Sequence, residues 1–256
     1  MFKNKLKASL IHLSLSLLLV LLIIGSTLFF LFPSMFIGVT DFKEVATIII
    51  SVDLVLGPLL TFVVFNPSKP RHLLYLDFAV IAVLQIGALS YGAYSLFQVH
   101  PVYVTFNVDR FTIVTAKDAE PEKAKLDEYK ISKFDAAKMA FAKMPTDLDK
   151  QNDILLNATV GGEDLDRLEE YYEPLEENVS TIMAKSLDPE VIFKNQEARS
   201  KEKSFYLKYK ENLSQYAYLP LNSMRKDAII VLNKKTAEPI ATLNLDPWNS
   251  SSSKSP

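Results

Sequence analysis

Four polar or ionisable side chains lie inside stretches of the chain that are otherwise apolar, and their spacing suggests two pairs. Asp53 is near the middle of residues 45–65, and Gln85 is near the middle of residues 73–97. Because only the short segment 66–72 joins these stretches, two helices here would run antiparallel and place Asp53 and Gln85 at the same depth. An ionisable residue at the centre of a membrane helix costs at least about 2.5 kcal/mol on insertion scales, so it needs a partner or a function.

The same comparison of depths pairs His12, in residues 8–32, with Asp77, near the start of residues 73–97. Two internal pairs would hold a helical bundle together, and this is the interpretation that we prefer. Two alternatives stay open: Asp53 faces a helix of a partner protein, or the polar residues form a pathway for protons or ions. Three helices with so few polar residues make a poor pathway.

Catalytic and metal-binding motifs are not found in the sequence. It contains no cysteine, which excludes thiolate metal ligands and cysteine nucleophiles. The histidines His12, His72 and His100 lack the spacing of metal ligands, and neither a glycine-rich phosphate loop nor a Gly-x-Ser-x-Gly motif occurs. The acidic stretch 163–177 is interpreted as the solvated face of a helix. We therefore predict that the protein is not an enzyme and has no catalytic residues, cofactor or metal ion.

The elements that carry the polar residues are predicted to be three transmembrane helices, at about residues 8–32, 45–65 and 73–97. The first stretch has 25 residues without an ionised side chain, which is enough to cross a bilayer. A cleaved signal peptide is the alternative, because three lysines precede the stretch. Signal cores are only about 7–15 residues long and end at small residues, whereas this stretch is longer and ends in phenylalanines. We predict an uncleaved helix.

Basic residues around these helices predict their orientation. Lys3, Lys5 and Lys7 precede the first helix, and Lys69 and Arg71 lie between the second and the third. The connection between the first and second helices has one lysine and two acidic residues. Because lysine and arginine are in excess on the cytoplasmic side of membrane proteins, the N-terminus is predicted to be cytoplasmic and residues 98–256 to lie outside.

Small and weakly polar residues recur on one side of each predicted helix. They are Ser9, His12 and Ser16 in the first helix, Ala46, Ile50, Asp53, Gly57 and Thr61 in the second, and Gln85, Ala88, Gly92 and Ser95 in the third. Such stripes let membrane helices approach each other closely. Pro58 removes a backbone donor and predicts a kink in the second helix. These residues are candidates for packing the bundle or for binding a partner's helix.

Residues 98–248 are predicted to form a soluble α+β domain, followed by a disordered, serine-rich tail at 249–256. Strands that could pair into an antiparallel sheet are predicted at 102–106, 111–115, 227–232 and 240–245, and helices at 121–144, 147–158, 164–172 and 189–210. The part after residue 97 has 22 basic and 26 acidic residues. This slightly acidic balance argues against nucleic acid as a partner.

Several short strings in the sequence resemble those of a known family. The most specific is Asp53-Leu-Val-Leu-Gly-Pro-Leu-Leu-Thr61, which continues to Phe65-Asn-Pro. The others are Pro101-Val-Tyr, Val108-Asp-Arg-Phe111, Gly161-Gly162 before Tyr171-Tyr172, Tyr218-Leu-Pro-Leu221, and Pro247-Trp248. These strings are ordered along almost the whole chain, which resembles the type IV pilin accessory proteins of the TfpX/TfpZ type in Gram-negative bacteria.

This resemblance implies a membrane α-helical protein of the bacterial inner membrane with a periplasmic domain. Its expected partners are the lipid bilayer, the cognate major type IV pilin, bound through the pilin's N-terminal membrane helix, and other pilus assembly components. Its expected role is that of a chaperone in pilus assembly. An alternative is a membrane-anchored sensor or regulatory subunit, which would act through a partner because the predicted cytoplasmic segments are short. A membrane enzyme would need an acidic metal-binding motif, which the sequence does not show.

Overall fold

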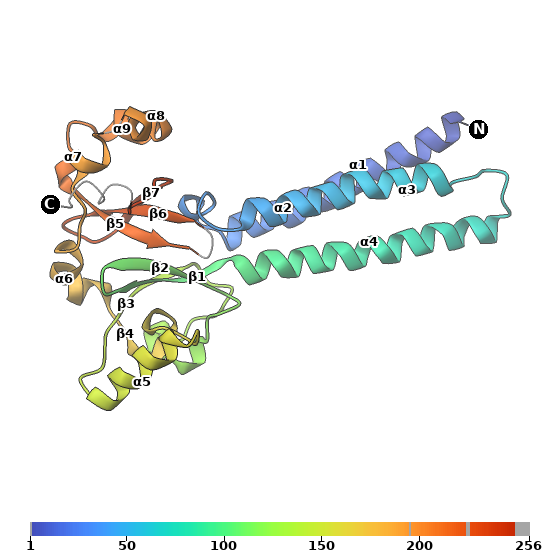
Figure 1. Cartoon of the computed structure of the whole chain (residues 1–256). Coiled ribbons are helices and arrows are strands. Elements are labelled where there is room, and N and C mark those ends of the chain that lie inside the picture. The colour runs from blue at the N-terminus through green and yellow to red at the C-terminus, as the bar shows by residue number, and fades with distance from the viewer. Residues whose placement is uncertain (1, 195, 224–225, 249–256) are drawn as a thin grey trace. The chain divides into compact units, whose positions relative to one another are not determined.

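The computed structural model describes residues 2–194, 196–223 and 226–248, and it contains two compact units (Figure 1). The three-helix unit comprises the chain up to Leu31 together with Asp41–Val99. The sheet domain comprises Phe32–Thr40 and the chain from His100 onward. The structure therefore adds Phe32–Thr40 to the domain predicted at 98–248. The predicted tail at 249–256 lies outside the described residues.

Three helices in the first unit are long and apolar enough to cross a membrane. They are α1 (Phe2–Phe30), the continuous helical stretch Phe42–Val64, and α4 (Arg71–Val99). The middle stretch consists of α2 (Phe42–Ser51), a π-helical turn (Val52–Leu56) and α3 (Gly57–Val64). The helices are confirmed at the predicted positions. α1 begins six residues before the predicted stretch and ends two residues before its end, and α4 is two residues longer at each end.

The π-helical turn Val52–Leu56 lies directly before Gly57 and Pro58. Proline has no backbone N–H, so one carbonyl of the preceding turn cannot receive its usual hydrogen bond. A wider turn, in which N–H groups reach back five residues instead of four, accommodates such a defect. The extra residue also rotates the start of α3, so that Asp53, Gly57 and Thr61 are all buried on the inner side of the bundle.

The sheet domain contains one mixed, seven-stranded sheet in the order β4-β3-β1-β2-β5-β6-β7. The strands are β1 (Pro101–Asn107), β2 (Arg110–Thr115), β3 (Lys138–Ala142), β4 (Tyr172–Glu173), β5 (Tyr216–Asn222), β6 (Asp227–Asn233) and β7 (Pro239–Leu243). β1 runs parallel to β3, and β2 runs parallel to β5, whereas the other neighbours are antiparallel. The α+β architecture is confirmed, but the sheet is not purely antiparallel.

Both faces of the central strands are covered, which explains their continuous apolar sequences. On one face, Val104, Phe106, Leu219 and Ile230 belong to a core that also contains Phe36, from the segment between α1 and α2. That segment is further attached by Thr242, whose hydroxyl donates a hydrogen bond to the Met35 carbonyl at 2.5 Å. The connection between two membrane-type helices is therefore part of the core of the sheet domain, which the sequence analysis did not predict.

The opposite face carries two aromatic groups. Tyr103 of β1 lies against Tyr172 and Tyr129, with ring centroids 5.2 and 6.5 Å away. Tyr218 of β5 lies against Phe193 and Phe205, at 6.1 and 6.5 Å. The short helices α7 (Pro189–Ile192), α8 (Gln196–Lys201) and α9 (Lys203–Tyr209) belong to the segment that carries Phe193 and Phe205.

Two predicted helices of this domain are wrong, and a third is helical but divided into shorter helices. The range 121–144 holds two short 3₁₀ turns, Pro121–Lys123 and Asp127–Tyr129, and then β3. Its lysine and alanine content favours a helix, but pairing with β1 outweighs that preference. The range 164–172 forms two 3₁₀ turns, and 189–210 is divided into α7, α8 and α9.

Two further helices complete the described domain. The predicted helix at 147–158 is confirmed as α5 (Leu148–Thr159), and Asp147 caps it by accepting from the backbone N–H groups of Asp149 and Lys150. A short helix, α6 (Val179–Met183), contributes Ile182 to the core on the first face.

Candidate functional site

The polar residues of the three-helix unit form one cluster, which draws on all three membrane-type helices. Ser9 of α1 donates a hydrogen bond from its hydroxyl to the Pro58 carbonyl at 2.8 Å. One turn further along α1, His12 Nδ1 lies 2.5 Å from Thr61 Oγ1. After another turn, Ser16 accepts from Gln85 Nε2 at 3.4 Å. The stripe predicted on α1 therefore meets polar partners on α3 and α4.

Asp53 lies in the π-helical turn and is only 4% exposed. Its carboxylate interacts electrostatically with His12. Gln85 was the partner expected from the sequence, but the amide of Gln85 donates to Ser16 instead. The prediction that Asp53 is buried inside the bundle agrees with the structure, whereas the predicted partner does not. Counting residues gives only the depth of a side chain, whereas the rotation of each helix decides which side chains meet.

The second predicted pair, His12 with Asp77, is not formed. Lys69, which precedes α4, reaches the Asp77 carboxylate with its ammonium group at 2.5 Å. His12 is instead bound to Thr61. A long, flexible lysine in a connecting segment can reach an acidic residue near the start of the next helix. Comparing the depths of residues within the helices leaves out such side chains.

Two glycines allow the helices to approach each other around this cluster. A Cβ atom at Gly57 would collide with the Gln85 amide and would lie 3.1 Å from His12 Nε2. A Cβ atom at Gly92 would lie 2.5 Å from Ile49 Cγ1 and 2.9 Å from Ile49 Cδ1. Hydrogen atoms at these positions are therefore part of the packing, as small residues in membrane helix interfaces commonly are.

The stripe predicted on the second helix needs one correction. Ala46, Asp53, Gly57 and Thr61 are buried, as an inward-facing stripe requires, but Ile50 is 40% exposed. Its neighbour Ile49 is buried in its place. In an uninterrupted α-helix, Ile50 would lie on the same side of the helix as Gly57. The π-helical turn between them adds a residue and rotates Ile50 away from that side.

The cluster joins the helices by hydrogen bonds and also buries one carboxylate. Its hydroxyl, imidazole and amide groups provide the hydrogen bonds that attach α1 and α4 to the middle helices. It also buries one carboxylate, Asp53, which interacts electrostatically with the imidazole of His12. Within the described part of the chain, no group of three or more His, Cys, Asp or Glu side chains is placed to hold a metal ion.

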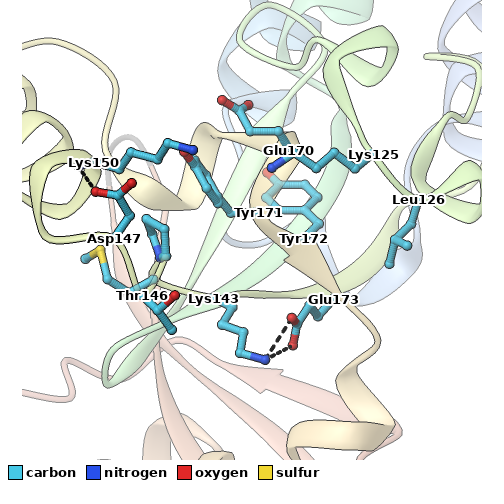
Figure 2. A pocket seen from close by; sticks show the side chains of 12 residues that line it. Lys125, Leu126, Lys143, Thr146, Asp147, Lys150, Glu170, Tyr171, Tyr172 and Glu173 are labelled. Atoms are coloured by element: carbon cyan, nitrogen blue, oxygen red, sulfur yellow. Dashed lines mark hydrogen bonds and ion pairs between the residues drawn. The ribbon is translucent and has the colours of Figure 1, made fainter.

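A separate cavity of about 420 Å³ lies in the sheet domain, beside β4 and the start of α5 (Figure 2). The Lys143 ammonium pairs with Glu173 at 2.9 Å, and the Lys125 ammonium lies 4.8 Å from the centroid of the Tyr171 ring. Figure 2 shows Lys150 and Lys125 extending toward Tyr171 from its two sides. Three lysines and three acidic residues line this cavity, so its charge favours neither an anionic nor a cationic ligand.

The acidic stretch 163–177 is not the solvated helix face that the sequence predicted. Glu169 is 1% exposed, and its Oε1 accepts from the backbone N–H of Glu120 at 2.8 Å. Burial raises the pKa of Glu169 above the ordinary value. The sequence contains one sign that this stretch packs against the sheet, namely the aromatic residues close to Glu169, Tyr171 and Tyr172.

The chain is similar in sequence to three fimbrial assembly proteins. Over 112 residues, the chain is 33% identical to the fimbrial assembly protein of serogroups C1 and C2 of Dichelobacter nodosus. The match covers 44% of this chain and 86% of that relative. The fimbrial assembly proteins of serogroups I and E1 of the same organism are 33% and 32% identical over 112 residues. This chain matches only 44% of the length of each of these two.

No family model matches the chain, and no solved structure matches it. Three apolar helices with an internal polar cluster, followed by a sheet domain, define a membrane-associated protein with an α+β domain. Because the match covers most of the serogroup C1 and C2 relative, the chain belongs to the family of the fimbrial assembly proteins.

Proposed function

We propose that this protein is an accessory factor of the TfpX/TfpZ type that engages the cognate fimbrial subunit, a type IV pilin, and promotes its assembly into fimbriae. The observation that carries this proposal is the similarity to three relatives named fimbrial assembly proteins. The role is one of binding rather than catalysis, since the buried polar groups of the three-helix unit are engaged with one another.

The outer surface of the three-helix unit supports a contact with an apolar helix of the subunit. Beyond Ser51, the exposed positions of the middle helices are apolar, among them Val55 and Val63, and Ile50 is an exposed apolar position in α2. Helices in a bilayer associate mainly by van der Waals packing and interhelical hydrogen bonds. In this proposal the subunit's N-terminal helix packs against that apolar surface before the subunit is polymerised, and the buried stripe of Ala46 and Gly57 holds the unit together.

The test is deletion of the gene, with surface fimbriae and total subunit counted separately. We expect few surface fimbriae while the subunit remains in the membrane, because assembly is impaired and synthesis is not. Photo-crosslinkers at Ile50, Val55 and Val63 should capture the subunit. Normal fimbriae in the deletion strain would refute the proposal. Capture from the sheet domain but from none of these three positions would refute the membrane contact.

We also propose that the protein lies in the inner membrane with a cytoplasmic N-terminus and a periplasmic sheet domain. The charge distribution around the helices supports this orientation. Because the chain has no native cysteine, single cysteines can be labelled without background. A membrane-impermeant reagent should label Ser132→Cys in intact cells and should label Ser68→Cys only after lysis. The reverse pattern would invert the orientation.

A further inference from the structure

Glu169 is a buried acidic residue in the turn that leads into the edge strand β4. It is 1% exposed and lies in the 3₁₀ turn Glu169–Tyr171, and β4 (Tyr172–Glu173) follows directly. Oε1 of Glu169 accepts from the backbone N–H of Glu120, whereas Oε2 has no hydrogen-bond partner among the described residues. Burial in an interior of low polarity strongly disfavours the charged form of such a carboxyl group.

The groups closest to the Glu169 carboxyl do not compensate for its burial. The carboxylates of Glu120 and Glu163 oppose a negative charge on Glu169. Two backbone N–H groups, those of Glu120 and of Glu169 itself, favour the charged form, but they do not outweigh desolvation. The pKa of Glu169 therefore lies above its ordinary value.

Basic side chains of the surrounding elements are engaged elsewhere. The turn Pro121–Lys123 and strand β3 pack against Glu169–Tyr171. In these two elements and in the segment before Glu169, each basic side chain is paired with another acid: Lys123 with Glu120, Lys138 with Glu128, and Arg167 with Asp118. Among the described residues, none of these cations forms an ion pair with Glu169.

The aromatic side chains next to Glu169 are also uncharged at neutral pH. Tyr103 of β1 and Tyr172 of β4 both interact electrostatically with Glu169, and burial raises the pKa of each phenol above its ordinary value. Two further acids, Glu122 and Asp166, act on these same phenols. The surroundings of Glu169 are therefore aromatic and acidic, and they suit the neutral carboxyl group better than the carboxylate.

The turn that contains Glu169 holds β4 at the edge of the sheet. Ala142 of β3 pairs with Tyr172, and the Lys143 backbone N–H donates to the Tyr171 carbonyl at 2.9 Å. Because β4 has only two residues, few backbone hydrogen bonds attach it to β3. Tyr171, Tyr172 and Glu173 also line the cavity shown in Figure 2. Detaching this turn would release β4, expose the edge of β3 and open the cavity.

We propose that Glu169 makes the attachment of β4 to the sheet dependent on pH. With its carboxyl group protonated, the turn Glu169–Tyr171 stays buried against the sheet. Loss of the proton places an uncompensated charge in the interior and favours release of the turn together with β4. This inference is independent of the proposed role in fimbrial assembly, because it concerns the sheet domain alone.

Linkage between proton binding and attachment gives the direction and the steepness of the effect. The pKa of Glu169 is raised while β4 is attached, whereas a released, hydrated glutamate returns to its ordinary value of 4.5. Attachment is therefore strongest below that ordinary value and weakens as the pH rises toward the raised pKa. Between these two pH values one proton is lost on release, so the ratio of released to attached molecules rises by up to about tenfold per pH unit.

Hydrogen exchange of the full chain in detergent tests the proposal. After correction for the intrinsic pH dependence of exchange, backbone amides of Glu169–Glu173 should exchange about tenfold or more faster at about pH 8 than at about pH 5. Glu169→Gln keeps an acceptor for the Glu120 N–H but does not ionise, so this ratio should fall to about one. At about pH 8, the variant should be better protected than the wild type.

Glu202→Gln is the matched control. Glu202 also accepts from a backbone N–H, that of Asn244, at 2.7 Å, and burial raises its pKa above the ordinary value. Asn244 directly follows β7, which lies at the opposite edge of the sheet from β4. This substitution should therefore leave the pH dependence of exchange in β4 unchanged.

Three results would overturn the inference. The first is equal corrected exchange of β4 in the wild type at both pH values, which needs no variant and decides the matter even if Glu169→Gln does not accumulate. The second is an unchanged pH dependence in Glu169→Gln. The third is loss of the pH dependence in Asp166→Asn but not in Glu169→Gln, which would assign the effect to the other partly buried acid of this segment.

Discussion

Replacing Gly92 with alanine is expected to destabilise the three-helix unit by about 1–3 kcal/mol, which is the usual cost of inserting a group into a well-packed interior. The new Cβ atom would lie 2.5 Å from Ile49 Cγ1 and 2.9 Å from its Cδ1. Ile49 is buried and β-branched, so its side chain has little freedom to move away. The measurement is unfolding of the purified protein in detergent, followed by temperature or by denaturant.

Gly87→Ala is the control for this variant. Gly87 lies on the same helix, α4, and a Cβ atom there would meet no atom within 4 Å. That substitution should leave the stability unchanged or raise it slightly, because alanine favours helix more than glycine does. Ile49→Ala removes both colliding atoms but also a buried side chain, so the double variant should be more stable than the sum of the two single changes predicts. Equal stability of the two glycine variants would show that α2 and α4 do not approach closely at Gly92.

The helices could be predicted because their signal is local. An apolar stretch of sufficient length, with basic residues at its ends, identifies a span without reference to the rest of the chain. The inward side of α1, with Ser9, His12 and Ser16, could be predicted from spacing in the same way. The π-helical turn could not, since its presence depends on how the chain accommodates Pro58 and Asp53 together. The position of Ile50 was wrong for this reason.

The sheet shows the limit of local patterns. β1, β2, β6 and β7 were predicted, because each has a β-rich sequence next to turn residues. β3 was mistaken for part of a helix, because its strand conformation depends on β1, far away in the sequence. β5 was not predicted. It contains Pro220, which ordinarily argues against an inner strand, but β2 pairs only with the following residues, Leu221 and Asn222.

The inward-facing polar residues could be predicted from the sequence, but their partners could not. Depth along a helix follows from counting residues, and it paired Asp53 with Gln85 and His12 with Asp77, whereas in the structure Asp53 interacts with His12. The actual contacts depend on helix rotation and on side-chain reach, which counting does not give. Lys69 illustrates this, because it lies in the connecting segment and still reaches Asp77.

Replacing Asp53 with asparagine is expected to lower the stability of the three-helix unit by about 1–3 kcal/mol. The carboxylate is buried and interacts electrostatically with His12, and this interaction is lost together with the charge while the polar side chain stays buried. Asp77→Asn is the matched control. The Asp77–Lys69 ion pair is partly exposed, and such pairs contribute only about 0–1 kcal/mol. The Asp77 variant should therefore be nearly as stable as the wild type.

A double-mutant cycle with His12→Gln tests whether Asp53 acts through His12. If the two side chains stabilise each other, the double variant should be more stable than the sum of the single changes predicts, by about 0.6–1.7 kcal/mol as for coupled polar groups in other membrane bundles. Additive effects would show that the two groups are independent and that Asp53 has another partner.

The single variant Asp53→Asn also distinguishes a structural role of Asp53 from direct contact with the fimbrial subunit. Because only 4% of Asp53 is exposed, a subunit helix packed against the outer surface of the bundle does not reach the carboxylate. Surface fimbriae should therefore decline with Asp53→Asn only in proportion to the amount of folded protein, and raising expression of the variant should restore them. Counting fimbriae against membrane-inserted protein at several expression levels gives this comparison. A variant that is abundant and as stable as the wild type, yet lacks fimbriae, would instead assign Asp53 to a contact with the subunit, made when the bundle opens.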